Sequence, residues 1–415
     1  MRTEHFVFFN QYYPPDLAPT GMMLRDVAEE MVAQGNRVTI VCSEGGYSAT
    51  TENSEYGGER GDVELLHVPS FRFGRKSSFG KLCDYLSFYF LAFWIGLTVS
   101  GNPTCFVAMT TPPYLSALVR ILSRLRNASH AHWVMDIYPD VLISHGVIGG
   151  KTLKARLLRA LSCWGFGGER NRKTISLGPD MAEKLKSLHG VDNGVWVPLW
   201  STANEGDQQE LVQERSLSLR KERGWNGKTV FLYSGNMGLG HYLVDFLTLA
   251  KENEGHSGLC FAFYGGGKRK EEVVRFMKQN PKAPIEVGDY VLEELLGAHL
   301  LSADVHLASL EPSWDGCMVP SKIQGIFASG RPVLFMGSNS SSIGQWITRS
   351  AAGWVVNPRD MIVLRTAFGE IFDEDLRVEK GMNAAAYYQK HFLRATNCKR
   401  VVLELTKRKC DSMRF

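Results

Sequence analysis

Short apolar runs alternate along this chain with longer segments in which apolar residues recur at helical spacing. In the first 200 residues, HFVFF, RVTIVC and VELLHV have the length and composition of buried strands, and MMLRDVAEEMVAQ has the period of an amphipathic helix. Apolar strands separated by helices are typical of parallel sheets that are covered on both faces. The pattern therefore predicts an α/β domain with a Rossmann-like arrangement.

A polar, irregular segment from Ser201 to about Gly227 interrupts this alternation, as an interdomain connection would. After it, KTVFLYSGNMGLGHYLVDFLTLA and LCFAFYGGGKRKEEVVRFM each predict a strand, a glycine loop and a helix. A chain of 415 residues also exceeds one ordinary core. We therefore predict two Rossmann-like α/β domains facing a central cleft, over 1–200 and 201–384, with a C-terminal helix at about 385–415 that packs back on the first domain.

The segment DVHLASLEPSWDGCMVPSKIQGIFASGRPVLF, residues 304–335, predicts a strand, a long loop, a helix and another strand. Pro320 and Ser321 stand where a helix takes a first-turn proline and a capping hydroxyl. Lys322 would then lie beside unpaired backbone N–H groups at the positive end of the helix. This position favours an anion such as phosphate, and an ordinary βαβ turn with a solvated lysine is the alternative.

Three further features lie at predicted strand ends. The glycines at 235–240 and 265–267 flank helix starts, where backbone N–H groups cradle a diphosphate or simply form tight βα turns. Gly21 begins the first helix and would let a ligand approach the backbone. Asp136 follows the strand in AHWVMDIYPDV, where ligands bind in open α/β sheets, although a helix-capping aspartate is the alternative.

Residues 71–99 combine a basic segment, FRFGRKSSFGK, with the apolar and aromatic segment LCDYLSFYFLAFWIGLTV at 82–99. The apolar segment predicts a helix that is buried on the sheet, lies in a membrane interface or crosses the bilayer. In the interfacial case, the basic side chains would contact lipid headgroups. They are Arg72, Arg75, Lys76 and Lys81.

The composition is that of an ordinary globular protein, and the net charge of +4 does not favour a nucleic-acid partner. The eight cysteines show no CxxC spacing, so neither a zinc site nor a disulfide framework is predicted, and a reducing cytoplasm fits best. The first residues enter a strand directly, without the pattern of a secretory signal.

Several motifs together resemble a known family. SGNMG after one strand, YGGG after the next, SADVHLASL and above all VPSKIQGIFASGRPVLF look like the nucleotide-sugar half of GT-B glycosyltransferases of family four. FFNQYYPPDLAPTG and WVMDIYPD are similar to segments of their acceptor half. The resemblance covers nearly the whole chain and is strongest to bacterial enzymes of surface-polysaccharide and O-antigen synthesis, such as colanic-acid transferases.

The resemblance implies a retaining hexosyl- or N-acetylhexosaminyltransferase that needs no metal or cofactor. It would move a sugar from a nucleotide-sugar, a UDP-sugar in most members, to a lipid-linked or saccharide acceptor. A polyprenyl-diphosphate-linked acceptor would place it on the inner face of the cell membrane, against an anionic surface. The implied catalytic residues are Lys322 and Asp136. The implied donor-binding residues are Gly21, Gly235, Asn236, Gly238, Gly265, Gly266, Glu311, Asp315, Ser321 and Lys322, and the implied acceptor-binding residues are Asn10, Tyr13, Asp136 and Tyr138.

The chain departs from the family pattern at two places. Cys317 and Gly325 stand where many members carry paired glutamates, so Glu311 and Asp315 are the candidates to replace them. His241 is the residue closest to a missing Arg or Lys after the first glycine loop. A nucleotide-sugar epimerase of the same architecture and a non-catalytic partner subunit are the alternative functions. An NAD-linked oxidoreductase is disfavoured because no GxGxxG is present.

Overall fold

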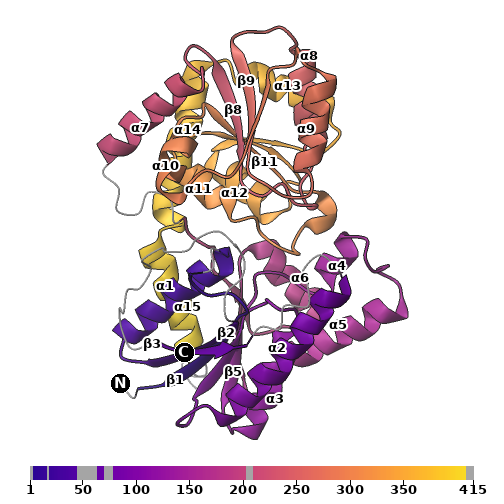
Figure 1. Ribbon diagram of the computed structural model, residues 1–415, viewed down its shortest axis with the longest axis vertical. Helices are drawn as coiled ribbons and strands as arrows, with labels where there is room; N and C mark the ends of the chain where they lie inside the picture. The colour runs from indigo at the N-terminus through magenta and orange to yellow at the C-terminus, as the bar shows by residue number, and fades with distance from the viewer. Residues whose placement is uncertain (1–2, 16–17, 44–62, 70–77, 202–208, 408–415) are drawn as a thin grey trace. The chain divides into compact units, whose positions relative to one another are not determined.

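The computed structural model describes residues 3–15, 18–43, 63–69, 78–201 and 209–407. The chain forms two compact units (Figure 1). The first comprises residues up to Pro198 together with the chain from Ala395 onward, and the second runs from Leu199 to Arg394. The sequence placed these boundaries at residues 200 and 384.

The first unit is built on a seven-stranded sheet in the order β3-β2-β1-β4-β5-β6-β7, and its neighbouring strands are parallel. Its strands are apolar and buried at the centre, as the sequence predicted for a sheet covered on both faces. The strands are β1 (His5–Phe9), β2 (Arg37–Ser43), β3 (Val63–Val68), β4 (Cys105–Ala108), β5 (Ser129–Trp133), β6 (Asn171–Ser176) and β7 (Gly194–Trp196).

Seven helices of the described chain accompany this sheet, and α2, α3 and α5 lie side by side along it (Figure 1). Phe88 and Ala92 of α2 and Leu118 of α3 pack with strand residues in one buried cluster. The helices are α1 (Pro19–Ala33), α2 (Ser78–Thr98), α3 (Leu115–Leu125), α4 (Asp140–Ser144), α5 (Leu153–Phe166), α6 (Pro179–His189) and α15 (Arg394–Thr406).

The second unit contains a six-stranded parallel sheet in the order β10-β9-β8-β11-β12-β13. Phe231 of β8 stacks on Phe261 of β9, with ring centroids 4.7 Å apart, in a fully buried core. The strands are β8 (Thr229–Ser234), β9 (Leu259–Tyr264), β10 (Ile285–Gly288), β11 (Val305–Ser309), β12 (Val333–Met336) and β13 (Gly353–Val356).

Helices alternate with these strands, as the pattern of the sequence predicted. They are α7 (Gln209–Glu222), α8 (Val244–Glu252), α9 (Lys270–Gln279), α10 (Glu293–Leu301), α11 (Lys322–Ala328), α12 (Ser342–Ser350), α13 (Met361–Glu370) and α14 (Glu374–His391). The prediction of two Rossmann-like parallel α/β units is confirmed.

Residues 82–98 of the apolar segment lie within α2, which has one buried and one exposed side. Phe88 and Ala92 are buried, whereas Leu86, Phe90 and Trp94 are exposed. Across the part of the chain that the structure describes, no helix combines the length and apolarity needed to cross a bilayer. The basic residues Arg72, Arg75 and Lys76 lie outside the described residues.

Candidate functional site

The loops that follow β8, β9 and β11 meet at the carboxyl ends of these neighbouring strands in the second unit. Ligands of open α/β sheets bind at this edge, because loops from adjacent strands and helix starts converge there. The predicted donor-binding residues fall on these loops, with Gly235, Asn236 and Gly238 after β8, and Gly265 and Gly266 after β9.

The two glycine loops are locked together by backbone hydrogen bonds. The amide of Gly235 donates to the carbonyl of Tyr264 at 2.9 Å, and the amide of Met237 donates to the carbonyl of Gly266 at 2.6 Å. A Cβ atom on Gly265, whose φ is +133°, would stand 2.1 Å from the carbonyl oxygen of Gly235. Gly265 therefore permits the close approach of the loops, and the amides of Gly235 and Met237 already have partners within the protein.

Lys322 begins α11 and extends to the first glycine loop. Its Nζ donates to the Tyr233 hydroxyl at 2.5 Å and to the carbonyl of Asn236 at 3.3 Å, and it lies 3.8 Å from the centroid of the Tyr233 ring. A Cβ atom on Gly235 would be 4.0 Å from Nζ. The structure thus brings Lys322, Gly235 and Asn236 to one place.

The ammonium group of Lys322 is surrounded by neutral groups. Its partners are an aromatic ring, a hydroxyl and a carbonyl, and burial lowers its pKa well below the ordinary value. Among the described residues, no carboxylate forms an ion pair with it. A bound anion would supply the missing countercharge and favour the protonated form of the lysine.

Tyr233 is a functional candidate that the sequence did not reveal. It lies near the end of β8 and is fully buried, and its place in the apolar strand sequence indicates an ordinary core residue. Its hydroxyl accepts from Lys322 and donates to the carbonyl of Asn236 at 3.0 Å. Burial raises its pKa well above the ordinary value, so it remains a neutral phenol. Tyr233 therefore positions the lysine without neutralising it.

His241 also lies close to this cluster and is neutral. Its Nδ1 donates to the carbonyl of Ser309 at 2.6 Å, which leaves Nε2 without a proton in the neutral ring. Burial lowers the pKa of His241 well below its ordinary value, and the positive charge of Lys322 lowers it further. His241 consequently does not replace the arginine or lysine that the family pattern places near this loop.

The predicted donor carboxylate Glu311 follows β11 and has a cationic partner. Its Oε1 lies 3.3 Å from an Arg359 guanidinium nitrogen, and that guanidinium stacks on Tyr242 at 4.7 Å from the ring centroid. Arg359 follows β13, and its own amide donates to Asp245 at 2.6 Å. Sequence reasoning missed Arg359 because 48 residues separate it from Glu311 and no local motif surrounds it.

Asp315 and Ser321 lie on the loop between β11 and α11. Asp315 is half-buried and follows a 3-10 turn at Pro312–Trp314, while the Trp314 ring packs against Gly240 of the first glycine loop. The expectation that Ser321 provides a capping hydroxyl is wrong, because its side chain makes no such bond. Its backbone is helical, with φ −67° and ψ −12°, whereas a capping residue has extended backbone.

In the first unit, the predicted residues after β1 lie in the loop to α1. Asn10 is fully buried, and its Nδ2 donates to the carbonyl of Tyr12 at 2.6 Å. A Cβ atom on Gly21 would lie 3.1 Å from backbone atoms of Tyr12 and Tyr13. Gly21 therefore lets α1 pack against its own loop. Tyr13 is half-buried, and burial raises its pKa.

Asp136 and Tyr138 lie between β5 and α4 of the first unit. The Asp136 amide donates to the Thr110 hydroxyl at 3.3 Å, and burial raises the pKa of its carboxyl to about 6. Tyr138 lies 6.3 Å, centroid to centroid, from Tyr114 at the start of α3. The helix-capping alternative for Asp136 is wrong, because α4 begins at Asp140 and its cap residue is Pro139.

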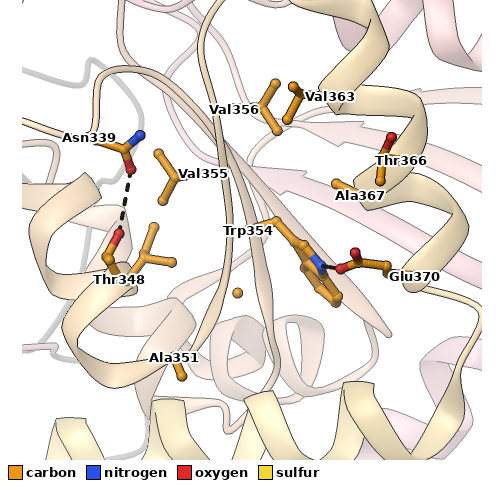
Figure 2. A pocket seen from close by; sticks show the side chains of 12 residues that line it. Asn339, Thr348, Ala351, Trp354, Val355, Val356, Val363, Thr366, Ala367 and Glu370 are labelled. Carbon is orange, nitrogen blue, oxygen red and sulfur yellow. Dashed lines mark hydrogen bonds between the residues drawn. The ribbon is translucent and has the colours of Figure 1, made fainter.

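A separate cavity of about 370 Å³ lies at the edge strand β13, between α12 and α13. Figure 2 shows its walls, which include Trp354, whose Nε1 donates to Glu370 at 2.8 Å, and Thr348, which faces Asn339. None of its lining residues belongs to the loops around Lys322. Within the described residues, no group of His, Cys, Asp or Glu side chains is arranged to hold a metal ion.

No protein-family model matches the chain. Among curated proteins, it is 26% identical over 328 residues to the probable glycosyltransferase WbjE of Pseudomonas aeruginosa, covering 77% of this chain and 80% of that protein. It is 22% identical over 342 residues to the putative colanic acid biosynthesis glycosyl transferase WcaI of Escherichia coli (strain K12), covering 80% of this chain and 83% of that protein.

Solved structures resemble nearly the whole chain. WaaG, a glycosyltransferase involved in lipopolysaccharide biosynthesis, has a TM-score of 0.67 at 14% identity and covers 97% of this chain and 100% of its own. Anabaena HepE in complex with UDP and glucose has a TM-score of 0.68 at 11% identity, and the match covers 97% of this chain and 99% of HepE. The fold is GT-B, and the resemblance predicted from the motifs is confirmed.

Proposed function

We propose that this glycosyltransferase of GT-B fold transfers a sugar from a UDP-sugar to a lipid-linked or saccharide acceptor in polysaccharide biosynthesis, with retention of anomeric configuration and without a divalent ion. The observation that carries the proposal is the ammonium of Lys322, which lies beside the Gly235 loop and whose partners among the described residues are neutral. The names of the relatives support the pathway, and the UDP and glucose held by HepE support the donor class.

The diphosphate of the donor would bind where Lys322 meets the first glycine loop. As the bond from the sugar C1 to the diphosphate oxygen breaks, negative charge accumulates on the leaving UDP. Lys322 stabilises this charge, because a fixed cation in a partly buried place interacts strongly with an oxyanion. Tyr233 holds the ammonium in position through its hydroxyl and its ring. Lys322 thus supplies countercharge that a metal ion supplies in other transferases.

The acceptor hydroxyl forms the new bond to C1 on the face that UDP leaves, and its proton passes to the departing phosphate. Asp136 and Tyr138 bind the acceptor in this proposal. With a carboxyl pKa of about 6, Asp136 is ionised at neutral pH and accepts a hydrogen bond from a sugar hydroxyl. This role orients the acceptor and leaves the proton transfer to the leaving group.

The test is release of nucleotide from a panel of nucleotide-sugars, with and without acceptor, in buffer that contains EDTA. Thermal shifts first rank the nucleoside diphosphates, because a ligand that binds the folded state raises the melting temperature by mass action. The proposal predicts that UDP and its sugars rank highest, and that acceptor-dependent release survives EDTA.

Two other results would overturn this assignment. An isomerised nucleotide-sugar formed without acceptor would identify an epimerase. A protein that binds no nucleotide would be a non-catalytic partner subunit.

A further inference from the structure

The cavity of about 370 Å³ lies along the outer edge of the second unit's sheet (Figure 2). Strand β13 is the last strand of that sheet and pairs with β12 on one side. It forms the floor of the cavity, with α12 as one wall and α13 as the other. The side chain of Val355 lies toward α12, and that of Trp354 lies toward α13. The edge of the sheet is therefore accessible between two helices.

The hydrogen bonds between β13 and β12 show which backbone groups of β13 remain available. The amide of Val333 donates to the carbonyl of Ala352 at 3.1 Å, and the amide of Gly337 donates to the carbonyl of Val356 at 2.9 Å. Because backbone groups along a strand point alternately to its two sides, the N–H and C=O groups of Val355 point away from β12. Neither group has a hydrogen-bond partner within the described chain. Val355 thus presents one donor and one acceptor at the floor of the cavity.

An unpaired strand edge is complementary to another extended backbone. A peptide that adds to such an edge gains main-chain hydrogen bonds, and its alternate side chains enter the pockets beside the edge. Here the walls offer apolar side chains, with Ile347 and Ala351 on the α12 side and Val363 and Ala367 on α13. Natural sheet edges are often protected by charged residues or proline, whereas β13, Gly353–Val356, contains neither.

The cavity carries negative charge at one end. Glu370 is the single charged residue among the described residues that line it. Its Oε2 accepts from Nε1 of Trp354 at 2.8 Å, and its Oε1 has no partner within the described chain; the Lys380 ammonium, 5.0 Å from the centroid of the Trp354 ring, forms no ion pair with Glu370 there. Helices α12 and α13 end near this place, at Ser350 and Glu370, and helix C-termini carry partial negative charge. This end therefore favours a basic group.

We propose that the cavity-lining parts of α12, β13 and α13, which we call the β13 groove, bind an extended peptide segment of a partner protein. The peptide adds as a further strand beside β13, places small apolar side chains between the two helices and directs a basic residue to Glu370. The position of β13 between two helical walls favours a single strand over a second copy of this chain, because the helices of the copy would meet these walls before the two edges could pair. The inference concerns a surface outside the loops around Lys322, and it holds whichever sugar is transferred.

The test is fluorescence anisotropy of two labelled hexapeptides mixed with the full chain. Their sequences are Lys-Val-Thr-Val-Thr-Val and its reverse, because a strand adds to an edge in parallel or antiparallel orientation. We expect one of them to bind. N-methylation of the alternate peptide residues that face β13 should weaken binding by about tenfold or more, since it removes hydrogen bonds to the edge. N-methylation of the intervening residues should leave binding unchanged.

The variant Val355→Pro removes the outward N–H from the floor of the groove. Edge strands accept proline where the N–H points away from the sheet, so the pairing with β12 should persist and the affinity for the peptide should fall by about tenfold or more. The matched control is Val287→Pro on β10, the opposite edge of the same sheet. The amide of Gly265 donates to the carbonyl of Gly288 at 3.2 Å, so Val287 likewise points its N–H away from the neighbouring strand. This control should bind the peptide as the unaltered chain does.

The variant Glu370→Gln keeps an acceptor for Trp354 and removes the charge. The affinity for the lysine peptide should fall by about fivefold. Replacing the peptide lysine with norleucine should then cost nothing further, because both changes remove the same ion pair. The matched control is Glu271→Gln, at an exposed glutamate of α9 that does not line the groove, and it should leave binding unchanged.

Failure of both peptides to bind the unaltered chain, or equal binding by Val355→Pro, would overturn the proposal. Equal binding of all N-methylated peptides would do the same, and this arm tests the hydrogen bonds without any change to the protein. Light scattering that shows a dimer which Val355→Pro converts to a monomer would also overturn it, since the edge would then join two copies of the chain.

Discussion

Replacing Lys322 with methionine removes the ammonium and keeps a side chain of similar length. At about 4 Å, a unit charge interacts with an oxyanion by about 4 kcal/mol at an effective dielectric constant of about 20. Deleting one oxyanion donor in other enzymes slows turnover by about 100- to 1000-fold. We therefore expect kcat of Lys322→Met to fall by about 100-fold or more. Donor affinity should fall less than kcat, because the charge on the leaving diphosphate is largest in the transition state.

The assay is initial-rate release of UDP under saturating acceptor, with unfolding followed in parallel. The matched control is Lys268→Met, because Lys268 is an exposed lysine on the second glycine loop. The fold should tolerate loss of Lys322, since its ammonium lies among neutral groups and its pKa is held low by burial. Near-normal turnover in Lys322→Met, or an equal loss in Lys268→Met, would refute this reasoning.

Three further predictions concern stability and pH. Gly265→Ala should cost at least about 2 kcal/mol of unfolding free energy, measured by urea titration, and should weaken UDP binding, because the new methyl group meets the Gly235 carbonyl at positive φ. The control Gly255→Ala, at φ +76° with open space around it, should cost about 1 kcal/mol in the same titration. The free enzyme should gain stability as the pH rises from the lowered pKa of Lys322 in the folded state toward its pKa of about 10.4 in the unfolded chain, because the unfolded chain binds more protons in this range. Melting curves recorded across this pH range should show the rise for the unaltered chain and lack it for Lys322→Met. Asp136→Asn should be more stable than the unaltered chain above pH 6, by up to about 3 kcal/mol. The reason is that the pKa of the Asp136 carboxyl is raised to about 6, so ionising it in the folded state costs stability between about pH 4 and pH 6. Urea unfolding on both sides of that range checks the sign of the effect, and a higher KM for the acceptor checks the role of Asp136.

The arrangement of strands and helices could be predicted because most strands, such as β1 and β4, are short apolar runs, and each connection that the structure describes contains a helix. The meeting of Lys322 with the Gly235 loop was also predictable, since carboxyl ends of neighbouring parallel strands share one edge of a sheet. Local pattern was sufficient wherever the chemistry depends on residues that follow a strand directly.

Other features of the site depend on packing that a linear pattern does not contain. Tyr233 reads as a core residue of β8, and only the position of α11 turns its hydroxyl into a partner of Lys322. Gly21 reads as a ligand-binding glycine, yet it accommodates the backbone of Tyr12 and Tyr13. The pairing of Glu311 with Arg359 depends on the order of strands in the sheet, which brings distant loops together.

The central claim is that a lysine with neutral partners binds the diphosphate of the donor. Isothermal titration of UDP in EDTA, in buffers of different ionisation enthalpy, tests it most directly. The pH should lie between the lowered pKa of Lys322 and its ordinary value. We predict that UDP binds with uptake of a proton, and that both the uptake and most of the affinity are lost in Lys322→Met. Binding of UDP to both proteins with equal affinity and no proton uptake would contradict the account.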